Sequence, residues 1–431
     1  MYLSTARAAD TAGGVARAGV RDSAAVRAVP ANVFVLGTVS LLTDVSAEMV
    51  TAVLPIYIVV GLGLSPLAFG LLDGVYGGVT ALVRLLGGHA ADRGRRHKLV
   101  AGLGYGLSAA AKPALLLVST VPGIAAVLAV DRSGKGLRTA PRDALISLSA
   151  GPRDQGRAFG MHRAMDTAGA LLGPLVAFGL LWAATDAYDA VFVVSGCVAV
   201  LGLLVLVLFV RPPAAGPGGG PGGGPGGGPG GREEARPSLR AAFGLLRLRA
   251  MRRICVCASL LGLVTISDAF LFLLIQRKLD LAPQWFPLLP LGTAAGFLAL
   301  AMPLGLLADR IGRWPVFVGG HMALLGAYAL LLLPYGGTPA VVAVLILHGV
   351  FYAATDGVLM AAAGPFLPAG LRASGLALVQ TGQAATRFVS SLAFGAAWTL
   401  WGMGPAVAAA AVALAGCTAV AVVLRPAEEP V

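Results

Sequence analysis

Charged side chains are scarce in this sequence of 431 residues, in which Asp, Glu, Lys and Arg together make up only 12%. A soluble globular domain carries about 25% of such residues, so the shortage argues against a water-soluble protein. Hydrophobic residues make up 57%, and the mean hydropathy is +0.83. These values indicate an all-α membrane protein, because a helix satisfies its own backbone hydrogen bonds inside a bilayer.

Acidic residues are fewer than basic ones, which leaves a formal net charge of +12. The basic residues occur in short clusters between apolar stretches rather than along one soluble face. This distribution argues against nucleic acid as a partner.

Cysteine is also rare, and its four positions all fall in apolar stretches: Cys197, Cys255, Cys257 and Cys417. Cys255 and Cys257 are two residues apart, so on a helix they point to nearly opposite sides. We interpret the cysteines as packing residues and expect neither a disulfide nor a metal site.

Motifs of catalysis are missing as well. The segment SGKG at 133–136 is not a phosphate-binding loop, because Gly136 rather than Ser or Thr follows Lys135. The sequence contains no H-E-x-x-H, no G-x-S-x-G and no Cys–His zinc spacing. We therefore expect no enzymatic activity, no cofactor and no bound metal.

Apolar stretches long enough to cross a bilayer, which takes about 20 residues per helix, occur twelve times. Turn-forming segments such as LPYGGTP and WGMGP separate several of them. The predicted spans are 31–60, 66–90, 97–119, 122–141, 156–183, 188–210, 252–276, 284–308, 314–335, 338–364, 371–398 and 404–424.

The predicted loops differ in their content of Lys and Arg. With the N-terminus inside, the inside loops hold clusters around Arg95, Arg142 and Arg310, whereas the outside loops hold only Arg277 and Lys278. By the positive-inside rule both termini are cytoplasmic. We expect a multi-pass protein of the plasma or inner membrane.

A Gly- and Pro-rich stretch divides the chain in two. Residues 211–237 repeat GPGG and have nothing to bury, which predicts a flexible linker. The basic, amphipathic segment 238–253 predicts a helix at the inner membrane surface. The predicted organisation is a cytoplasmic tail (1–30), a six-span bundle (31–210), the linker with its interfacial helix (211–251), a second six-span bundle (252–424) and a tail (425–431).

The two bundles contain similar loop sequences. AADRGRR at 90–96 corresponds to LADRIGR at 307–313, and GRAFG at 156–160 corresponds to LRASG at 371–375. The two pairs have nearly the same offset and lie in equivalent inside loops. This pattern indicates a duplicated six-helix unit.

The second-half loop carries a recognisable pattern. GLLADRIGR resembles G-x-L-A-D-R-x-G-R, the loop signature of the major facilitator superfamily, and it lies between spans eight and nine, where that family has it. The matching residues are Gly305, Asp309, Arg310, Gly312 and Arg313.

The first-half loop has a similar but imperfect pattern, because one residue is missing between Arg93 and Gly94. Its matching residues are Gly88, Asp92, Arg93 and Arg96. The segment DRSGKGLRTAPRD, at 131–143, also resembles a bacterial and archaeal branch of the superfamily.

Span five resembles the antiporter signature of exporters in the same superfamily. The matching residues are Gly160, Gly169, Gly173 and Pro174, whereas the closing glycine pair is absent at 177–178.

The resemblance implies twelve transmembrane helices in two pseudo-symmetric six-helix bundles that rock around a central site lined by spans one, four, seven and ten. A charge at mid-bilayer costs about 2.5–3.5 kcal/mol unless it is paired or faces a wet cavity. Ionisable residues within spans are therefore expected on the spans that line the cavity, and the sequence has some on each of the four. Those on the four lining spans are Asp44, Glu48, Asp131, Asp268, His348 and Asp356.

Asp44 and Glu48 are four residues apart and share one helical face. Two nearby carboxylates resist double ionisation, so one of them can take up and release a proton. Our hypothesis is that this pair couples transport to protons, and the alternative is a fixed pair held by the basic residues of spans four and five. Asp268, Asp356 and His348 are further candidates for proton coupling.

Other polar residues in the spans are candidates for the cavity or the substrate site: Asp73, Tyr76, Asp131, Arg132, Lys135, Arg163, Asp166, Gln380, Gln383 and Arg387. Asp131 and Lys135 are one turn apart, so each can neutralise the other. Gln380, Gln383 and Arg387 form a stripe that, with Arg132 and Lys135, suits an anionic group. The Arg163–Asp166 pair is either a structural ion pair or a substrate contact.

The resemblance and the acidic cavity together favour proton-coupled export of a small organic molecule, such as a drug-like compound or a siderophore. Basic groups on spans four, five and eleven leave open an importer of an organic anion or zwitterion, and a non-transporting receptor is a more remote alternative. We expect a monomer whose partners are its substrate, protons and the lipid bilayer.

Overall fold

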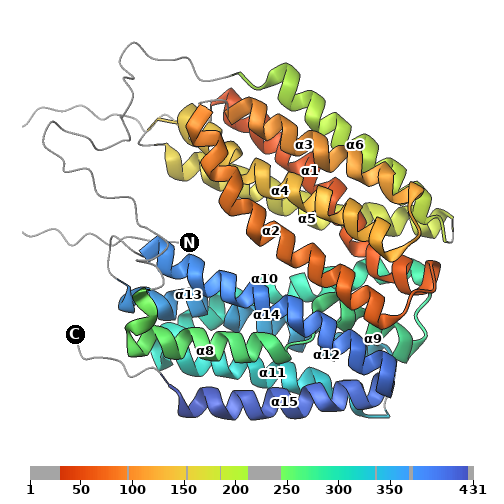
Figure 1. The fold of residues 1–431 in the computed structure, drawn as a ribbon, viewed down its shortest axis with the longest axis vertical. Coiled ribbons are helices and arrows are strands. Elements are labelled where there is room, and N and C mark those ends of the chain that lie inside the picture. The colour runs from red at the N-terminus through yellow and green to blue at the C-terminus, as the bar shows by residue number, and fades with distance from the viewer. Residues whose placement is uncertain are drawn as a thin grey trace, which may run out of the picture.

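A computed structural model describes residues 30–94, 97–151, 154–184, 186–211, 244–334, 337–367 and 372–425. Within these ranges the chain is helical and contains no strand, which confirms the all-α prediction (Figure 1). Residues 1–29 of the predicted tail and most of the linker at 211–251 lie outside the described residues, as does most of the tail at 425–431.

The first half of the chain forms a group of long helices, drawn red to light green in Figure 1. These are α1 (Ala31–Ile56, continued by a π-helical turn, Tyr57–Gly61), α2 (Pro66–Gly94), α3 (His97–Ala114), α4 (Val121–Ser149), α5 (Gln155–Ala183) and α6 (Tyr188–Phe209).

The second half forms another group, drawn green to blue. It contains α8 (Arg249–Val264), α9 (Asp268–Leu279), a 3-10 segment η4 (Pro283–Leu288), α10 (Leu289–Ile311), α11 (Arg313–Leu332), α12 (Thr338–Thr355), α13 (Val358–Ala363), α14 (Arg372–Trp401) and α15 (Met403–Val423). A short 3-10 turn, Leu245–Arg247, precedes α8, so the helix begins slightly before the predicted span.

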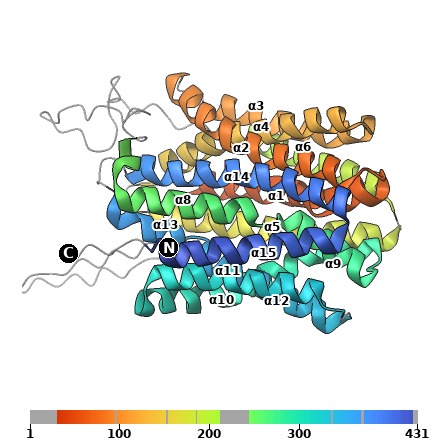
Figure 2. The same cartoon turned by 60° about the horizontal axis from the view of Figure 1, so that its bottom comes forward.

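Nine helical segments in the described residues are long and apolar enough to cross a membrane. They lie in windows where the sequence predicts spans. Helices α2, α4 and α14 run alongside them (Figures 1 and 2). One end of the molecule, here called the terminal end, carries the start of α1, the end of α6, the start of α8 and the end of α15, and the far end carries the connections α1–α2 and α9–α10.

The two groups meet toward the far end. Figure 2 shows α2 of the first group next to α14 of the second. The ring of Phe69 on α2 lies 4.9 Å from that of Phe270 on α9, and Trp285 in η4 lies 5.5 Å from Trp182 and 5.4 Å from Phe178 on α5. Toward the terminal end the groups lie farther apart (Figure 1).

The seventh predicted span is broken in the structure. Thr265, Ile266 and Ser267 leave the helical conformation and separate α8 from α9. The freed backbone groups find partners on other helices: the Ile266 N–H donates to Tyr328 Oη at 2.7 Å, and the Thr265 carbonyl accepts from Ser390 Oγ at 2.6 Å. Such partners make a helix break tolerable within a membrane.

The tenth predicted span is broken as well, between α12 and α13. The break falls at Asp356 and Gly357, and Gly357 has φ +78°, a conformation that glycine adopts without strain. The fourth predicted span, 122–141, is too short, because α4 continues through Pro141 to Ser149.

Helices α1 and α5 approach each other closely at glycines of the span-five pattern. A Cβ atom at Gly169 would lie 2.5 Å from the Leu41 carbonyl oxygen, and one at Gly173 would lie 2.7 Å from Glu48 Cβ. A Cβ at Gly160 would meet nothing within 4 Å. Gly169 and Gly173 therefore act through helix packing, which brings α5 onto the face of α1 that carries the acidic residues.

A buried ion cluster joins α3 to α4. Asp131 Oδ1 lies 2.5 Å from Lys112 Nζ and accepts from Ser108 Oγ at 2.5 Å, and Asp131 Oδ2 accepts from Arg132 Nε at 2.9 Å. All four side chains are buried. Asp131 and Arg132 therefore belong to the interior of the first group.

This pairing differs from the predicted neutralisation of Asp131 by Lys135, which makes no ion pair within 4 Å among the described residues. The physical reason is the close approach of the helices, since a Cβ at Gly134 would lie 2.5 Å from the Gly104 carbonyl oxygen. That approach places Lys112 of α3 directly against Asp131.

Gly173→Ala is expected to destabilise the protein by about 1–3 kcal/mol, because the added methyl group overfills the α1–α5 contact. The melting temperature in detergent measures the effect. Gly160→Ala is the matched control, and its melting temperature is expected to equal that of the wild type. Equal melting temperatures for the two variants would contradict the packing role of Gly173.

Lys112→Met is expected to cost about 3 kcal/mol, because it leaves the buried Asp131 carboxylate with less compensating charge. Thermal unfolding in detergent again gives the readout. Arg310→Met removes an exposed cation on α10 and serves as control. If both variants lose the same small amount of stability, the cluster does not hold α3 to α4.

Candidate functional site

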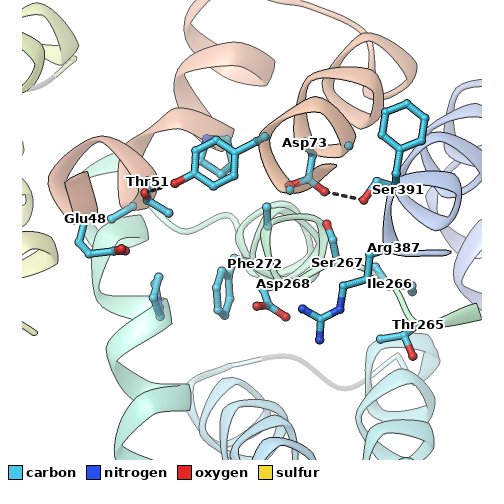
Figure 3. Close-up of a pocket in the computed structure, with 18 of the residues that line it drawn as sticks. Glu48, Thr51, Asp73, Thr265, Ile266, Ser267, Asp268, Phe272, Arg387 and Ser391 are labelled. Atoms are coloured by element: carbon cyan, nitrogen blue, oxygen red, sulfur yellow. Dashed lines mark hydrogen bonds between the residues drawn. The ribbon is translucent and has the colours of Figure 1, made fainter. Parts of the chain in front are cut away.

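A cavity of about 420 Å³ lies between the two groups (Figure 3). Helices α1 and α2 contribute to one side, and the α8–α9 break, η4, α12 and α14 contribute to the other. Its polar lining residues are Glu48, Thr51, Asp73, Tyr76, Thr265, Ser267, Asp268, Tyr352, Arg387 and Ser391. Phe272, Phe286 and Phe388 add aromatic surface.

A second cavity, of about 340 Å³, adjoins the first and lies mainly within the second group. The two share Gly77, Thr265, Tyr352 and Arg387. The second cavity adds a different set of polar side chains: His321, Thr355, Asp356, Gln380 and Gln383. The predicted stripe of Gln380, Gln383 and Arg387 thus faces one space.

Asp268 lies at the start of α9, just after the break, and is surrounded by hydrogen-bonding groups. Tyr352 Oη lies 2.6 Å from each of its carboxylate oxygens. His348 Nε2 lies 3.3 Å from Asp268 Oδ1, and the other ring nitrogen of His348 lies 3.1 Å from Thr293 Oγ1. This chain of groups can hold a proton at Asp268 or pass one along.

Asp73 lies on α2 at the border between the cavity and the contact with α14. Ser391 Oγ donates to Asp73 Oδ2 at 2.5 Å, a bond that joins the two groups of helices (Figure 3). Asp73 makes no ion pair within 4 Å among the described residues.

Glu48 lines the same cavity from α1, and it too has no ion pair within 4 Å in the described part of the chain. Beside it, Thr51 Oγ1 lies 2.5 Å from Tyr76 Oη. The guanidinium of Arg132 lies 3.9 Å from the centre of the Tyr76 ring on its other side, which fixes that ring as a wall of the cavity.

Asp44 does not line either cavity; it faces the basic residues of α4. Its Oδ1 lies 3.8 Å from Arg138 Nη2, and Asp166 on α5 lies 3.6 Å from Arg142 and 3.9 Å from Arg163. The Arg163 side chain is 82% exposed. The structure therefore places Asp44 between Arg138 and the Asp166 carboxyl, which is its hydrogen-bonding neighbour, whereas Glu48 lines the cavity.

The two cavities carry more negative than positive charge. Four carboxylates line them: Glu48, Asp73, Asp268 and Asp356. Among the described lining residues Arg387 is the one Lys or Arg, and it borders both spaces. An acidic cavity with aromatic walls attracts organic cations.

The loop pattern between α10 and α11 has a structural role in the second group. Gly312, with φ +96°, allows the sharp turn between the helices, and Arg313 Nη1 donates to the Ala361 carbonyl of α13 at 2.7 Å. Asp309 and Arg310 are exposed, and a Cβ at Gly305 would meet open space.

The first-half copy of that pattern is described less fully. Gly88, Asp92 and Arg93 lie within the backbone of α2. Arg96 lies outside the described residues.

Sequence reasoning missed five polar residues of the first cavity: Tyr352, Ser391, Ser267, Thr51 and Thr265. Tyr352 follows His348 by four residues, so it shares that face of α12. Ser391 follows Arg387 by four residues and extends the predicted polar stripe of α14, while Ser267 directly precedes Asp268. The i, i+4 spacing was the signal that could have identified the first two.

Comparisons with known proteins agree with this architecture. The family model of the Major Facilitator Superfamily matches residues 36–388. An uncharacterised MFS-type transporter of Methanocaldococcus jannaschii is 27% identical over 374 residues, which cover 87% of this chain and 90% of that protein. An uncharacterised protein of Mycobacterium tuberculosis is 34% identical over 159 residues, covering 36% of this chain and 38% of that protein.

Solved structures share the fold at low sequence identity. The nucleoside transporter NupG has a TM-score of 0.75 at 15% identity, covering 92% of this chain and all of that one (100%). A POT family transporter in complex with 5-aminolevulinic acid has a TM-score of 0.72 at 15% identity, covering 92% and 96%. A bacterial homolog of the human lysosomal transporter Spinster, in an inward-facing and unoccupied conformation, has a TM-score of 0.67 at 16% identity, covering 91% and 94%.

The family model spans most of the chain, and the helices, the cavity between their two groups and the solved structures of the same fold agree with it. This chain therefore belongs to the major facilitator superfamily and is a multi-pass membrane transporter.

Proposed function

We propose that this protein is a proton-coupled secondary transporter that exports a small organic molecule with a cationic group by alternating access. The observation that carries the proposal is the excess of carboxylates among the described residues around the two adjoining cavities, four against one arginine, Arg387. Opposite charges attract more strongly in a poorly solvated cavity than in water.

The apolar part of the cavity lining suits an organic rather than an inorganic cation. Phe272, Phe286 and Phe388 line the first cavity together with Tyr76. Aromatic faces bind cations and apolar groups alike. A volume of about 420 Å³ is within the range of small-molecule binding sites.

Proton coupling is assigned to Asp268 with His348 and Tyr352. The three groups are in hydrogen-bonding contact, and Asp268 faces the cavity where the substrate binds. The pair of Asp44 and Glu48, our hypothesis from the sequence, stays a candidate: Glu48 has no ion pair in the described residues and lines the cavity, and Asp44 lies 3.8 Å from Arg138 outside it.

We further propose twelve membrane spans in two bundles, at 31–210 and 252–424, with both termini in the cytoplasm. Nine apolar helices and the placement of α2, α4 and α14 beside them support this topology. In this orientation the terminal end is cytoplasmic, and the contacts at the far end close the external side. The described state is then inward-facing.

The span-five glycines favour export. They resemble the antiporter signature, and Gly173 packs against Glu48 at the edge of the cavity. A second candidate function, import of a zwitterion, is favoured by Arg387 with Gln380 and Gln383, which offer hydrogen-bond donors to an anionic group in the second cavity. The net acidic charge of the cavities makes the cation the better candidate.

Asp268→Asn is expected to reduce proton-driven transport at least tenfold, because asparagine preserves the shape of the side chain but cannot bind a proton. The assay uses proteoliposomes with an internal pH dye and labelled benzylguanidinium as the probe. Exchange of the probe without a proton gradient should persist.

Asp189→Asn, at an exposed carboxylate on α6, is the matched control and should keep proton coupling intact. Unchanged proton movement in Asp268→Asn would remove Asp268 from the coupling mechanism.

Arg387→Gln separates the two candidate functions. For a cationic substrate the half-saturating concentration should fall about fivefold to tenfold, because a repelling charge is removed from the cavity. For a zwitterion it should rise, because the partner of the anionic group is lost. Transport rates are measured against concentration for benzylguanidinium, the cation, and for phenylalanine, which is a zwitterion at neutral pH. A lower half-saturating concentration of phenylalanine in the variant would contradict the role of Arg387 as partner of an anionic group.

A further inference from the structure

Helices α2 and α14 are packed at backbone distance across the two groups. A Cβ at Gly70 would lie 2.4 Å from the Ser391 carbonyl oxygen, and one at Gly395 would lie 2.5 Å from the Pro66 carbonyl oxygen. We call this contact, formed by Pro66–Asp73 with Ser391–Thr399, the α2–α14 seam. It borders the cavity through Asp73 and Ser391 and extends from there toward the far end.

The seam has few directional bonds among the described residues. Near the far end the Leu67 N–H donates to Thr399 Oγ1 at 3.0 Å. At the cavity edge Ser391 Oγ donates to Asp73 Oδ2 at 2.5 Å. The second bond differs from the first because its acceptor also lines the cavity, where a ligand can reach it.

The surroundings of Asp73 supply hydroxyl groups rather than a cation. Besides Ser391, the hydroxyl of Ser267 at the helix break is a hydrogen-bonding neighbour of the Asp73 carboxylate. The charged groups that face it are Asp268 on α9 and Arg387 on α14. Arg387, the cation of the two, forms no ion pair with Asp73 within 4 Å in the described residues. Figure 3 shows these side chains converging on one space.

We propose that Asp73 anchors the substrate through N–H hydrogen bonds and that this anchoring opens the α2–α14 seam. The inference rests on the proposed function, because it assumes an organic cation in the cavity. A charged N–H donor forms a stronger bond to a carboxylate than a hydroxyl does, so it displaces Ser391. Loss of that bond weakens the seam on the side opposite to the one from which the substrate arrives.

The chemistry of the anchor defines the ligand class as ammonium or guanidinium ions that carry N–H groups. A quaternary ammonium has the same charge but no N–H donor, so it cannot replace the hydroxyl protons. The aromatic side chain of Phe388 packs over Gly74, next to Asp73, and offers a surface for the apolar part of the ligand.

The other cavity carboxylates do not offer the same coupling. Asp268 is already engaged by Tyr352 and His348 within the second group. Glu48 lies on α1, away from the seam. A cation bound to either of them leaves the bond between Asp73 and Ser391 in place.

The test measures the opening of the far end directly. Spin labels are attached at Leu117→Cys and Leu400→Cys, two exposed positions on opposite groups at the far end, after the native cysteines are replaced by alanine. Distance distributions are recorded in proteoliposomes without ligand, with benzylguanidinium and with benzyltrimethylammonium. Transport of both probes is measured in the same preparations.

In the wild type we expect benzylguanidinium to increase the long-distance population at least threefold, and benzyltrimethylammonium to leave it unchanged. Ser391→Ala should raise this population without ligand, because one seam bond is gone. Asp73→Asn keeps a hydrogen-bond acceptor for Ser391 but loses the charge, so it should stay closed and stop responding to benzylguanidinium. Thr38→Ala removes a hydroxyl on α1 that donates to the Phe34 carbonyl of the same helix; it is the control and should match the wild type.

An equal response to both probes, or a response that survives in Asp73→Asn, would overturn the inference. If both probes are transported with proton coupling under those outcomes, the proposed function stands and only the role of Asp73 fails. If neither probe is transported nor shifts the distance in the wild type, the proposed function fails and the anchor fails with it.

Discussion

The low polarity of a bilayer interior imposes one condition on this structure: each carboxylate within the helices must be paired, protonated or in contact with water. The chain meets that condition in two ways. Asp131 is enclosed by Lys112, Ser108 and Arg132, and Asp44 lies beside Arg138. Glu48 and Asp73, which form no ion pair within 4 Å in the described part of the chain, face the space between the two helix groups. Pairing therefore consolidates the first group, and the absence of pairing marks the residues available to a ligand.

Close helix contacts make this separation possible. Gly104 and Gly134 bring α3 against α4 so that Lys112 reaches Asp131, and Gly169 and Gly173 bring α5 against α1. The same residue type at Gly70 joins α2 to α14 across the two groups. Glycine thus determines which charged side chains meet, although it carries no charge itself.

The sequence alone predicted much of the fold, because apolar length and loop charge depend on local composition. It placed helices in the correct windows, and helical spacing predicted that Gln380, Gln383 and Arg387 share a face. It failed where a partner comes from another helix. Lys135 looked like the partner of Asp131 because it is one turn away, but Lys112 lies closer in space. The break at Thr265–Ser267 was also hidden, because its stabilising groups, Tyr328 and Ser390, belong to distant helices.

The two helix breaks lie in the same half of the molecule. In the second group the helical chain is interrupted at Ile266, between α8 and α9, and at Gly357, between α12 and α13. The predicted duplication makes α1 and α4 their counterparts in the first group, and both of these helices are continuous. The two groups therefore differ in the regularity of the helices at equivalent positions. The broken helices carry Asp268 and Asp356 into the cavities, so the irregular backbone of the second group lies where a ligand would bind. The first group differs at the equivalent place, because its unbroken α4 is joined to α3 through the buried pair of Asp131 and Lys112.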